Sequence, residues 1–306
     1  MIDVLKKQMK EYFVGHENVA DGVLTCLLAG GHVLLEDVPG VGKTTLARIL
    51  AGGVACDFGR IQFTPDTLPG DVVGTSVYNP KTGDFSYREG AIMHQILLAD
   101  EINRTSPKTQ ASLLEAMAEG RVTVDGTTYT LPQPFMVIAT QNPVEFLGTY
   151  PLPEAQLDRF MMRLSVGYPE EDEELRLAKN FLAGKTADTV QSVCTAEDVV
   201  TMRGQVEEVR TEDNMIRYIR DIVRRTREEK SFVLGASPRA MLDLIRASQA
   251  RAFLSGRDFV KPDDVKAVAV HVLHHRLTLT PEAGIRNDDV DRILKEIILD
   301  TGIPME

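Results

Sequence analysis

"HVLLEDVPGVGKTTLARILAGG" (residues 32–53) decides the fold, because it joins a strand to a helix through a glycine-containing loop. The stretch 32–37 predicts a buried strand, and the segment from Lys43 has helical periodicity and ends at glycine. A strand, a Gly-Lys-Thr loop and a helix are the context in which backbone N–H groups wrap phosphates. The pattern G-x-x-x-x-G-K-[ST] is met except at one position, where Asp37 replaces glycine.

The loop predicts a nucleotide site despite that replacement. Gly40 and Gly42 allow a close approach of the backbone and unusual dihedral angles, and Lys43 supplies charge to the outer phosphates. Asp37 lies at the end of the strand, outside the phosphate nest, and aspartate tolerates left-handed turn geometry. The alternative is a glycine-rich turn with an accidental lysine. The residues expected to bind nucleotide are Pro39, Gly40, Val41, Gly42, Lys43, Thr44 and Thr45, with the Thr44 hydroxyl also offered to Mg²⁺.

Composition places the chain among globular proteins. It has 306 residues, 43% hydrophobic and 26% charged, and a net charge of −11. An acidic balance disfavours a general nucleic-acid surface, which needs a basic face. The three cysteines are far apart and are read as buried apolar residues, and no apolar stretch has the length of a membrane span. We therefore expect a cytoplasmic protein with no nucleic acid partner and no membrane insertion.

Strand and helix patterns divide the chain near residue 168. Residues 95–100 ("QILLAD") and 135–140 ("FMVIAT") predict two further strands of a parallel sheet. The stretches 70–92 and 120–131 predict projecting hairpins, the second around Asp125-Gly126. From residue 169 the pattern is helical, including a helix that begins at "SPRA" with a Ser cap. The predicted fold is an α/β core (1–168) followed by an all-α domain (169–306).

Polar residues follow two of the predicted strands. "ILLADE" ends in Asp100, which can hold Mg²⁺ together with Thr44, and Glu101, which can polarise an attacking water. "VIATQNP" places Gln141 and Asn142 at another strand end, where an amide can reach the γ-phosphate or the water. Acidic strand caps and an Asn-Pro turn are the alternative interpretations. The order Lys43, then Asp100-Glu101, favours phosphoryl transfer.

Four stretches taken together resemble the MoxR family of AAA+ ATPases, in the helix-2-insert clade. They are "LLEDVPGVGKTT" (34–45), "LLADEINRTSPKTQASLLEAMAEGRVTVDG" (97–126), "VIATQNPVEFLGTYPLPEAQLDRF" (137–160) and "SPRA" (237–240). The likeness covers nearly the whole chain. Aspartate is familiar in that family at the position of Asp37, which implies a working loop. The resemblance also implies a P-loop NTPase core with a helical lid, the 70–92 stretch being the insert and 120–131 the pre-sensor hairpin.

The resemblance assigns roles to single residues. Lys43 and Thr44 match the Walker A pair, Asp100 and Glu101 the Walker B pair, and Asn142 the sensor 1 amide. The resemblance also assigns roles to two arginines. Arg159 matches the arginine finger that enters a neighbouring subunit's site, and Arg239 matches sensor 2. Val14 and Gly15 resemble the adenine-pocket segment. From the residues alone, Arg159 could instead pair with Asp158 or Glu154, and Arg239 could cover its own helix.

The function implied is ATP hydrolysis with Mg²⁺, with ATP and ADP as ligands, in a homo-oligomeric ring that is expected to be a hexamer. The family implies remodelling of partner proteins that carry a von Willebrand factor A domain. The alternatives are a related chelatase or nucleic-acid helicase motor, a small-molecule kinase or GTPase, and a nucleotide-binding scaffold. An Asn-Lys-x-Asp guanine motif is absent from the sequence, and a scaffold can dispense with Glu101.

Other polar features have simpler explanations. "HVLHH" places His271 and His275 at the spacing of a zinc-binding helix, but Val272 stands where the glutamate is needed. His32 precedes a buried strand and is read as a core histidine. The arginines at 224, 225 and 227 are followed by Glu228 and Glu229, which indicates a salt-bridged helix surface.

Overall fold

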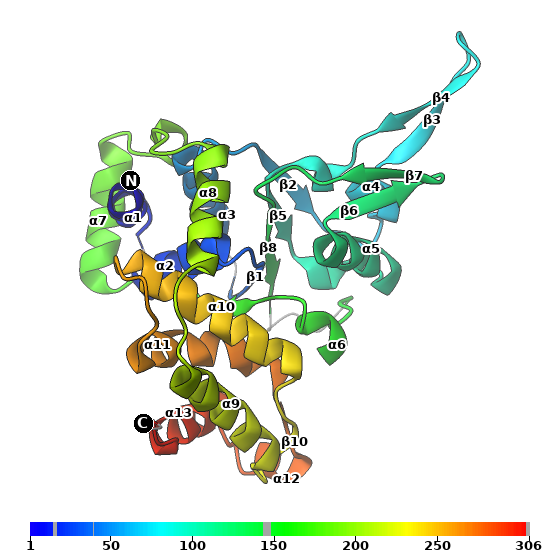
Figure 1. Ribbon diagram of the computed structural model, residues 1–306. Coiled ribbons are helices and arrows are strands. Elements are labelled where there is room, and N and C mark those ends of the chain that lie inside the picture. Colours follow the sequence, from blue (N-terminus) through cyan, green and yellow to red (C-terminus); the bar gives the residue numbers. More distant parts are fainter. Residues whose placement is uncertain (15–16, 39, 143–147, 304–306) are drawn as a thin grey trace. The chain divides into compact units, whose positions relative to one another are not determined.

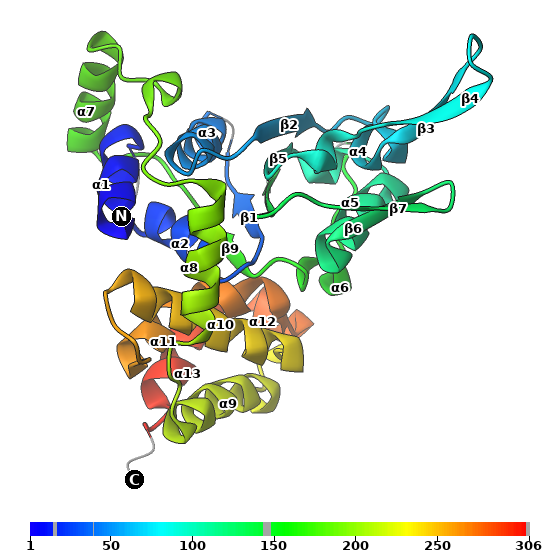
Figure 2. The ribbon, with the colours of Figure 1, turned by 45° about the horizontal axis from the view of Figure 1, so that its top comes forward.

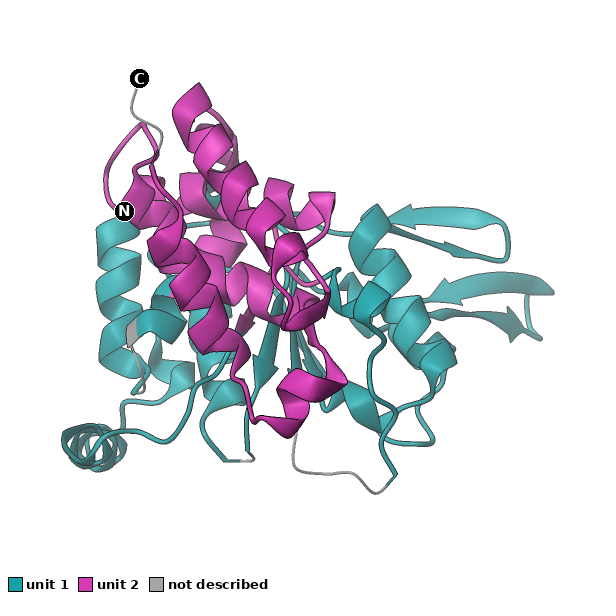
Figure 3. Ribbon diagram, turned by 90° about the horizontal axis from the view of Figure 1, so that it is seen from below, with its two compact units in different colours: residues 1–21, 32–159, 164–200 teal, residues 22–31, 160–163, 201–306 magenta. Residues whose placement is uncertain are grey.

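The structure, a computed structural model, describes residues 1–14, 17–38, 40–142 and 148–303. These divide into two compact units, coloured separately in Figure 3. Unit 1 contains residues 1–21, 32–159 and 164–200, and unit 2 contains residues 22–31, 160–163 and 201–306. The division therefore differs from a single cut at 168, because the helix α7 (Glu171–Leu182) is placed with unit 1. The domain boundary near 168 stays a prediction.

Unit 1 is built on a sheet with the strand order β2-β5-β8-β1-β9, in which the pairs β2–β5, β5–β8 and β1–β8 are parallel and β9 is split by the division (Figure 1 and Figure 2). The strands are β1 (Val33–Glu36), β2 (Phe58–Gln62), β5 (Ile96–Asp100), β8 (Met136–Gln141) and β9 (Met162–Leu164). The three strands predicted from apolar runs are confirmed as β1, β5 and β8. Their side chains are buried on both faces, as a sheet covered on both sides requires. The sequence did not predict β2 or β9.

The register brings the carboxyl ends of the strands to one edge of the sheet. Gln62 of β2 pairs with Asp100 of β5, and Glu36 of β1 pairs with Gln141 of β8. The polar residues that end these strands therefore gather along the same edge, which is where ligands bind in open α/β sheets. The helix α3 (Lys43–Gly53) starts at this edge directly after the loop that follows β1.

Unit 1 contains several helices besides α3. They are α1 (Ile2–Tyr12), α2 (Glu17–Leu28, which the division splits), α4 (Pro69–Val73), α5 (Pro107–Glu119), α6 (Glu154–Leu157) and α7. Single 3₁₀ turns occur at Ala91–Met93, Ile102–Arg104 and Ala187–Thr189. Helix α5 illustrates the local logic, because Ser106 caps it by accepting from the Thr109 amide and Pro107 occupies its first position.

Two antiparallel hairpins extend from unit 1 on the same side (Figure 1 and Figure 2). They are β3 (Thr75–Asn79) with β4 (Asp84–Arg88), and β6 (Arg121–Val124) with β7 (Thr127–Thr130). The two stretches predicted to be hairpins therefore are hairpins. The rings of Tyr87 on β4 and Tyr129 on β7 stack with centroids 4.0 Å apart. This stack joins one hairpin to the other.

Unit 2 is largely helical. Its helices are α8 (Ala196–Glu207, which the division also splits), α9 (Asp213–Glu228), α10 (Pro238–Leu254), α11 (Pro262–Leu273), α12 (Pro281–Ile285) and α13 (Val290–Asp300). A 3₁₀ turn, His274–Arg276, follows α11, and a short antiparallel pair joins β10 (Phe232–Leu234) to β11 (Thr278–Leu279). The predicted start of α10 is confirmed, because the Ser237 hydroxyl accepts from the Ala240 amide at 3.1 Å.

Candidate active site

The loop after β1 leads into α3 through two glycines in left-handed conformations. Gly40 has φ 88° and Gly42, the N-cap of α3, has φ 89°. Residues other than glycine rarely adopt these φ angles, so the backbone conformation favours glycine at both positions. The first amides of a helix lack partners within the helix and point at whatever lies before its N-terminus. The loop therefore presents donors suited to an anion.

Lys43 is the first residue of α3 and reaches back over the loop. Its Nζ donates to the carbonyl oxygen of Asp37 at 2.9 Å and lies in a partly buried position. Burial lowers the pKa of Lys43, and the nearby charges of Asp37, Asp100 and Glu101 raise it in opposition. The ammonium group is thus held close to acidic residues by a bond to a neutral carbonyl, which leaves donors for a phosphate.

Asp37 has a different role from the one inferred from its sequence position. Positive φ angles among the described non-glycine residues occur at Ala55, Glu101, Asp125 and Asn287, so Asp37 makes no use of left-handed tolerance. Its carboxylate is buried and accepts from the segment that follows β9. Oδ1 accepts from the Ser165 hydroxyl at 2.9 Å and the Gly167 amide at 3.0 Å, and Oδ2 accepts from the Val166 amide. A glycine at position 37 could make none of these bonds.

The acidic pair at the end of β5 is held by a threonine on β8. Thr140 is fully buried, and its hydroxyl donates to Asp100 Oδ1 at 2.6 Å while accepting from the Glu101 amide at 2.8 Å. Glu101 has φ 56°, an unfavourable angle for glutamate. Strained residues of this kind occur often at functional sites. Thr140 therefore fixes both the direction of Asp100 and the backbone turn at Glu101.

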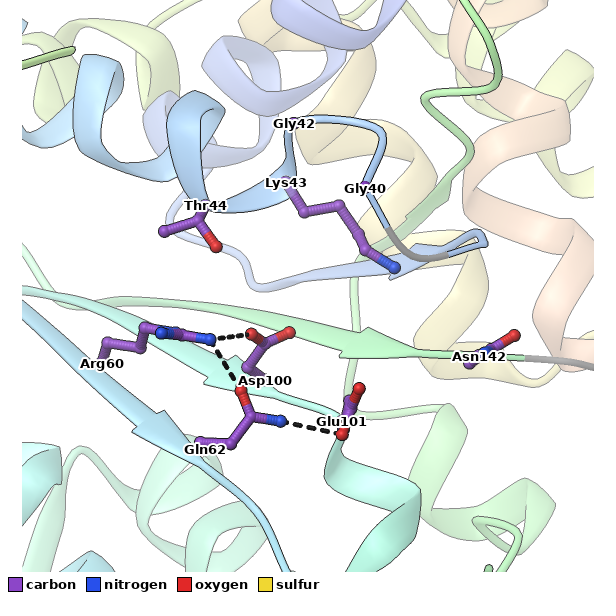
Figure 4. Close-up of a pocket in the computed structure, with 9 residues that line it drawn as sticks. All are labelled: Gly40, Gly42, Lys43, Thr44, Arg60, Gln62, Asp100, Glu101 and Asn142. Atoms are coloured by element: carbon purple, nitrogen blue, oxygen red, sulfur yellow. Dashed lines mark hydrogen bonds and ion pairs between the residues drawn. The ribbon is translucent and has the colours of Figure 1, made fainter. Parts of the chain in front are cut away.

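Two residues of β2 complete this edge and were not predicted. Arg60 Nη2 donates to Asp100 Oδ2 at 2.8 Å and to Gln62 Oε1 at 2.7 Å (Figure 4). Gln62 Nε2 in turn donates to Glu101 Oε2 at 2.8 Å, an oxygen that also accepts from Arg104 Nη1 at 3.0 Å. Arg60 and Gln62 are two apart in a strand and so share one face. The two-residue spacing in the sequence could have indicated that both side chains lie on one face, but only if residues 58–62 were known to form a strand.

One cavity brings most of these side chains together (Figure 4). Its volume is about 390 Å³, within the usual range for ligand sites. The described residues that line it are Gly40, Gly42, Lys43, Thr44, Arg60, Gln62, Asp100, Glu101 and Asn142. Asn142 is buried beside it, whereas the Gln141 amide turns to Glu36 Oε1 at 2.6 Å. The strand pattern alone left both amides open and the family resemblance selected Asn142, which is the amide that lines the cavity.

The donors in this cavity suit Mg²⁺. Thr44 supplies a hydroxyl and Asp100 a carboxylate, and Mg²⁺ prefers oxygen ligands and is usually bound through one or two carboxylates together with phosphates and water. Among the described residues no group of three or more His, Cys, Asp or Glu side chains forms a complete metal site. The Thr44 hydroxyl and the Asp100 carboxylate therefore fit a metal that also takes phosphate and water ligands.

A second cavity of about 270 Å³ shares Thr44 with the first. It is also lined by Thr45, Tyr12 and Arg48. Val14, two residues after Tyr12, is buried, and the ring of its neighbour Phe13 lies within van der Waals reach of Gly42. Gly15 and Pro39 lie outside the described residues, and Val41 is buried within the loop.

Neither of the two predicted arginines is among the described residues that line the cavity. Arg159 follows α6, and its Nη1 donates to the Leu114 carbonyl oxygen of α5 at 2.6 Å. Arg239 is the second residue of α10 in unit 2 and is exposed to solvent. The roles of Arg159 as a finger and of Arg239 as a sensor stay predictions.

Two histidines considered in the sequence, His32 and His275, are buried and lie within hydrogen-bond distance of backbone groups. His32 is buried, with Nδ1 accepting from the Val137 amide at 3.0 Å and Nε2 lying 3.3 Å from the Met117 carbonyl oxygen. His275 Nε2 lies 2.8 Å from the Phe160 carbonyl oxygen, and burial holds its pKa well below the usual value. On α9, Arg224 pairs with Glu228 at 2.8 Å, in line with a salt-bridged surface.

The described helices include none with the length and apolar character of a membrane span.

Comparison with known proteins gives consistent matches over nearly the whole chain. The model of the "ATPase family associated with various cellular activities (AAA)" matches residues 32–162, and that of the AAA lid domain matches residues 224–297. The Bacillus subtilis protein YeaC is 50% identical over 98% of this chain and 94% of its own length. Chaperone MoxR1 of Mycobacterium tuberculosis is 38% identical over 97% of this chain and 81% of its own length.

A solved structure agrees with these matches. The crystal structure of a protein from Cytophaga hutchinsonii superposes with a TM-score of 0.92 at 39% identity, covering 99% of this chain and 95% of that one.

Proposed function

The chain belongs to the MoxR family of AAA+ ATPases, and from this premise we propose that it hydrolyses ATP with Mg²⁺ in a ring of identical subunits to remodel partner proteins. The observation that carries the proposal is the cavity at the sheet edge, where Lys43, Thr44, Asp100 and Glu101 meet. A phosphate donor, a metal ligand pair and a carboxylate for water are the parts that phosphoryl transfer needs.

Each residue has a task in that reaction. Lys43 and the first amides of α3 bind the outer phosphates, while Thr44 and Asp100 hold Mg²⁺. Bound Mg²⁺ neutralises charge on the phosphates. Glu101 orients and polarises the attacking water, and Asn142 reaches the γ-phosphate or that water. Thr45, which lines the second cavity, and the predicted adenine-pocket residues Val14 and Gly15 would take the ribose and adenine.

The proposed assembly and client are carried over from the family that the chain resembles. Arg159 of one subunit enters the site of the next, and Arg239 reports the γ-phosphate to the lid. A guanidinium brought to a phosphoryl transition state raises the rate by about 10³–10⁵ in other NTPases. The ring is a hexamer in the cytoplasm, and its partner carries a von Willebrand factor A domain. The relative named Chaperone MoxR1 supports a chaperone-like role.

The test separates binding from hydrolysis by two substitutions in the cavity. Glu101→Gln is expected to bind ATP with wild-type affinity but to lower turnover by about 10²–10⁴, the usual contribution of a general base. Lys43→Ala is expected to weaken ATP binding itself, because it removes charge from the outer phosphates. Calorimetric titration and phosphate release are measured for both, with Arg121→Gln, an exposed residue on β6, as control. Wild-type turnover in Glu101→Gln would remove Glu101 from the mechanism.

A further inference from the structure

Arg60 places a fixed positive charge on the carboxylate that the metal needs. Its Nη2 lies 2.8 Å from Asp100 Oδ2, in the cavity that also contains Lys43 and Thr44 (Figure 4). The second carboxylate oxygen, Oδ1, accepts from Thr140 at 2.6 Å. Both oxygens of Asp100 are therefore engaged, and its charge is already balanced by a cation of the chain itself.

The sheet holds this pair in place. β2 runs parallel to β5, and Arg60 is opposite Leu98, two residues before Asp100. Gln62, opposite Asp100, accepts from Arg60 Nη2 at 2.7 Å and so orients the guanidinium. The Asp100 side chain is 14% exposed and that of Arg60 is 47% exposed. The carboxylate is thus enclosed, while the arginine has room to swing into solvent.

These features point to an exchange of cations at Asp100. We propose that Arg60 is a stand-in for Mg²⁺: it neutralises Asp100 when the metal is absent, and the metal displaces it when the metal binds with nucleotide. The inference rests on the proposed function, because it requires the cavity to bind nucleotide and Mg²⁺. It concerns how the site is kept ready, and it assigns Arg60 a positioning and charge-balancing role.

The proposal predicts changes of opposite sign in Arg60→Gln. Without metal, an unbalanced Asp100 repels the phosphates, so the affinity for ADP in EDTA falls. With ADP present, Mg²⁺ no longer competes with a guanidinium, so less Mg²⁺ is needed for half-saturation. A partly exposed ion pair worth about 1 kcal/mol corresponds to about fivefold in each constant. Because the two changes belong to one linkage cycle, they offset each other, and affinity in saturating Mg²⁺ stays close to wild type.

The experiment is calorimetric titration of ADP into the full-length protein in EDTA and in saturating Mg²⁺, followed by titration of Mg²⁺ at fixed ADP. Arg60→Lys, which keeps the charge, is expected to lie near wild type, and Arg121→Gln controls for loss of a surface arginine. Weaker ADP binding in EDTA together with a lower Mg²⁺ midpoint supports the exchange.

Three other results overturn it. If Arg60→Gln leaves both constants unchanged, Arg60 does not compete at Asp100, and the proposed function stands. If both constants weaken, Arg60 only supports the structure of the site. If the wild-type protein binds no ADP in either condition, the proposed function fails together with this inference.

Discussion

Asp37 joins two segments that are far apart in the sequence. Its carboxylate accepts three hydrogen bonds from residues 165–167, while its own carbonyl oxygen accepts from Lys43 Nζ. One residue thus fixes the chain after β9 and positions the lysine of the phosphate loop. Charged acceptors make the stronger hydrogen bonds in proteins, and a buried amide that loses its partner is costly.

We expect Asp37→Gly, which restores the commoner loop pattern, to destabilise the protein. Glycine has no carboxylate, so the Val166 and Gly167 amides lose their acceptor. The free energy of unfolding should fall by about 3 kcal/mol. Asp37→Asn keeps one acceptor oxygen and should fall between glycine and wild type. Thermal unfolding of the three proteins measures the order. A glycine variant as stable as wild type would show that these contacts contribute little.

Much of the cavity could be predicted at the scale of residues, because local patterns carry it. Lys43, Thr44, Asp100, Glu101 and Asn142 end or follow recognisable apolar strands, and all five line one cavity. Their chemical roles stay predictions. The residues that sequence reasoning missed act through the sheet register, which periodicity does not reveal: Arg60, Gln62 and Thr140 reach the acidic pair only because β2 and β8 flank β5.

At the scale of elements, the 3₁₀ turn after α11 anchors the chain at Phe160. The Phe160 carbonyl oxygen lies 2.8 Å from both His275 Nε2 and Arg276 Nη2, and Arg276 also pairs with Asp243 at 2.6 Å. Met161 packs against Gly31 so closely that a Cβ there would lie 2.6 Å from its side chain. The segment directly after Arg159 is therefore held firmly within unit 2.

This anchor should make stability depend on pH. Burial holds the pKa of His275 well below 6.5, and the charges of Arg276, Arg163 and His274 lower it further. The hydrogen bond to Phe160 acts in the opposite direction and raises the pKa. Burial also lowers the pKa of His271. The unfolded chain therefore binds protons near pH 6.5 that the folded chain does not, so stability falls as pH falls below that value.

The measurement is thermal unfolding between pH 7.5 and 5.5 for wild type and His275→Gln. Glutamine keeps a donor for the Phe160 carbonyl but takes no proton, so the variant should have the shallower pH dependence, by up to about 1.4 kcal/mol per pH unit. Parallel curves for the two proteins would exclude His275 as a source of the effect.

Elements with strong apolar or capping signals were predictable, and weakly patterned ones were not. The runs at β1, β5 and β8 and the Ser-Pro start of α10 are local signals. Strand β2 is polar at alternate positions, and β9 has three residues. Their strand structure depends on pairing with neighbours in the sheet, which is a tertiary effect.

At the scale of the whole molecule, the proposed ring makes each site depend on two subunits. Arg159→Ala and Glu101→Gln should each be nearly inactive alone, since one lacks the finger and the other the catalytic carboxylate. A mixed ring contains junctions where an intact Glu101 meets a neighbour's intact Arg159. Random mixing in equal amounts should restore about a quarter of the wild-type turnover.

Phosphate release from the mixture, after subunits are exchanged, measures this recovery. Mixing Glu101→Gln with Lys43→Ala is the control that should regain little, because neither subunit can then complete a site of its own. A mixture of Arg159→Ala with Glu101→Gln that stays inactive would mean that Arg159 does not act across a junction.

The stack of Tyr87 on Tyr129 changes how the longer hairpin bears a load. An isolated two-stranded hairpin bends easily, and it bends more the longer the part that no other element supports. The stack supports β4 near the base of its hairpin, where Tyr87 pairs with Ser76. A force applied at the tip of this hairpin is therefore also carried by the hairpin β6–β7, and the two hairpins should bend together.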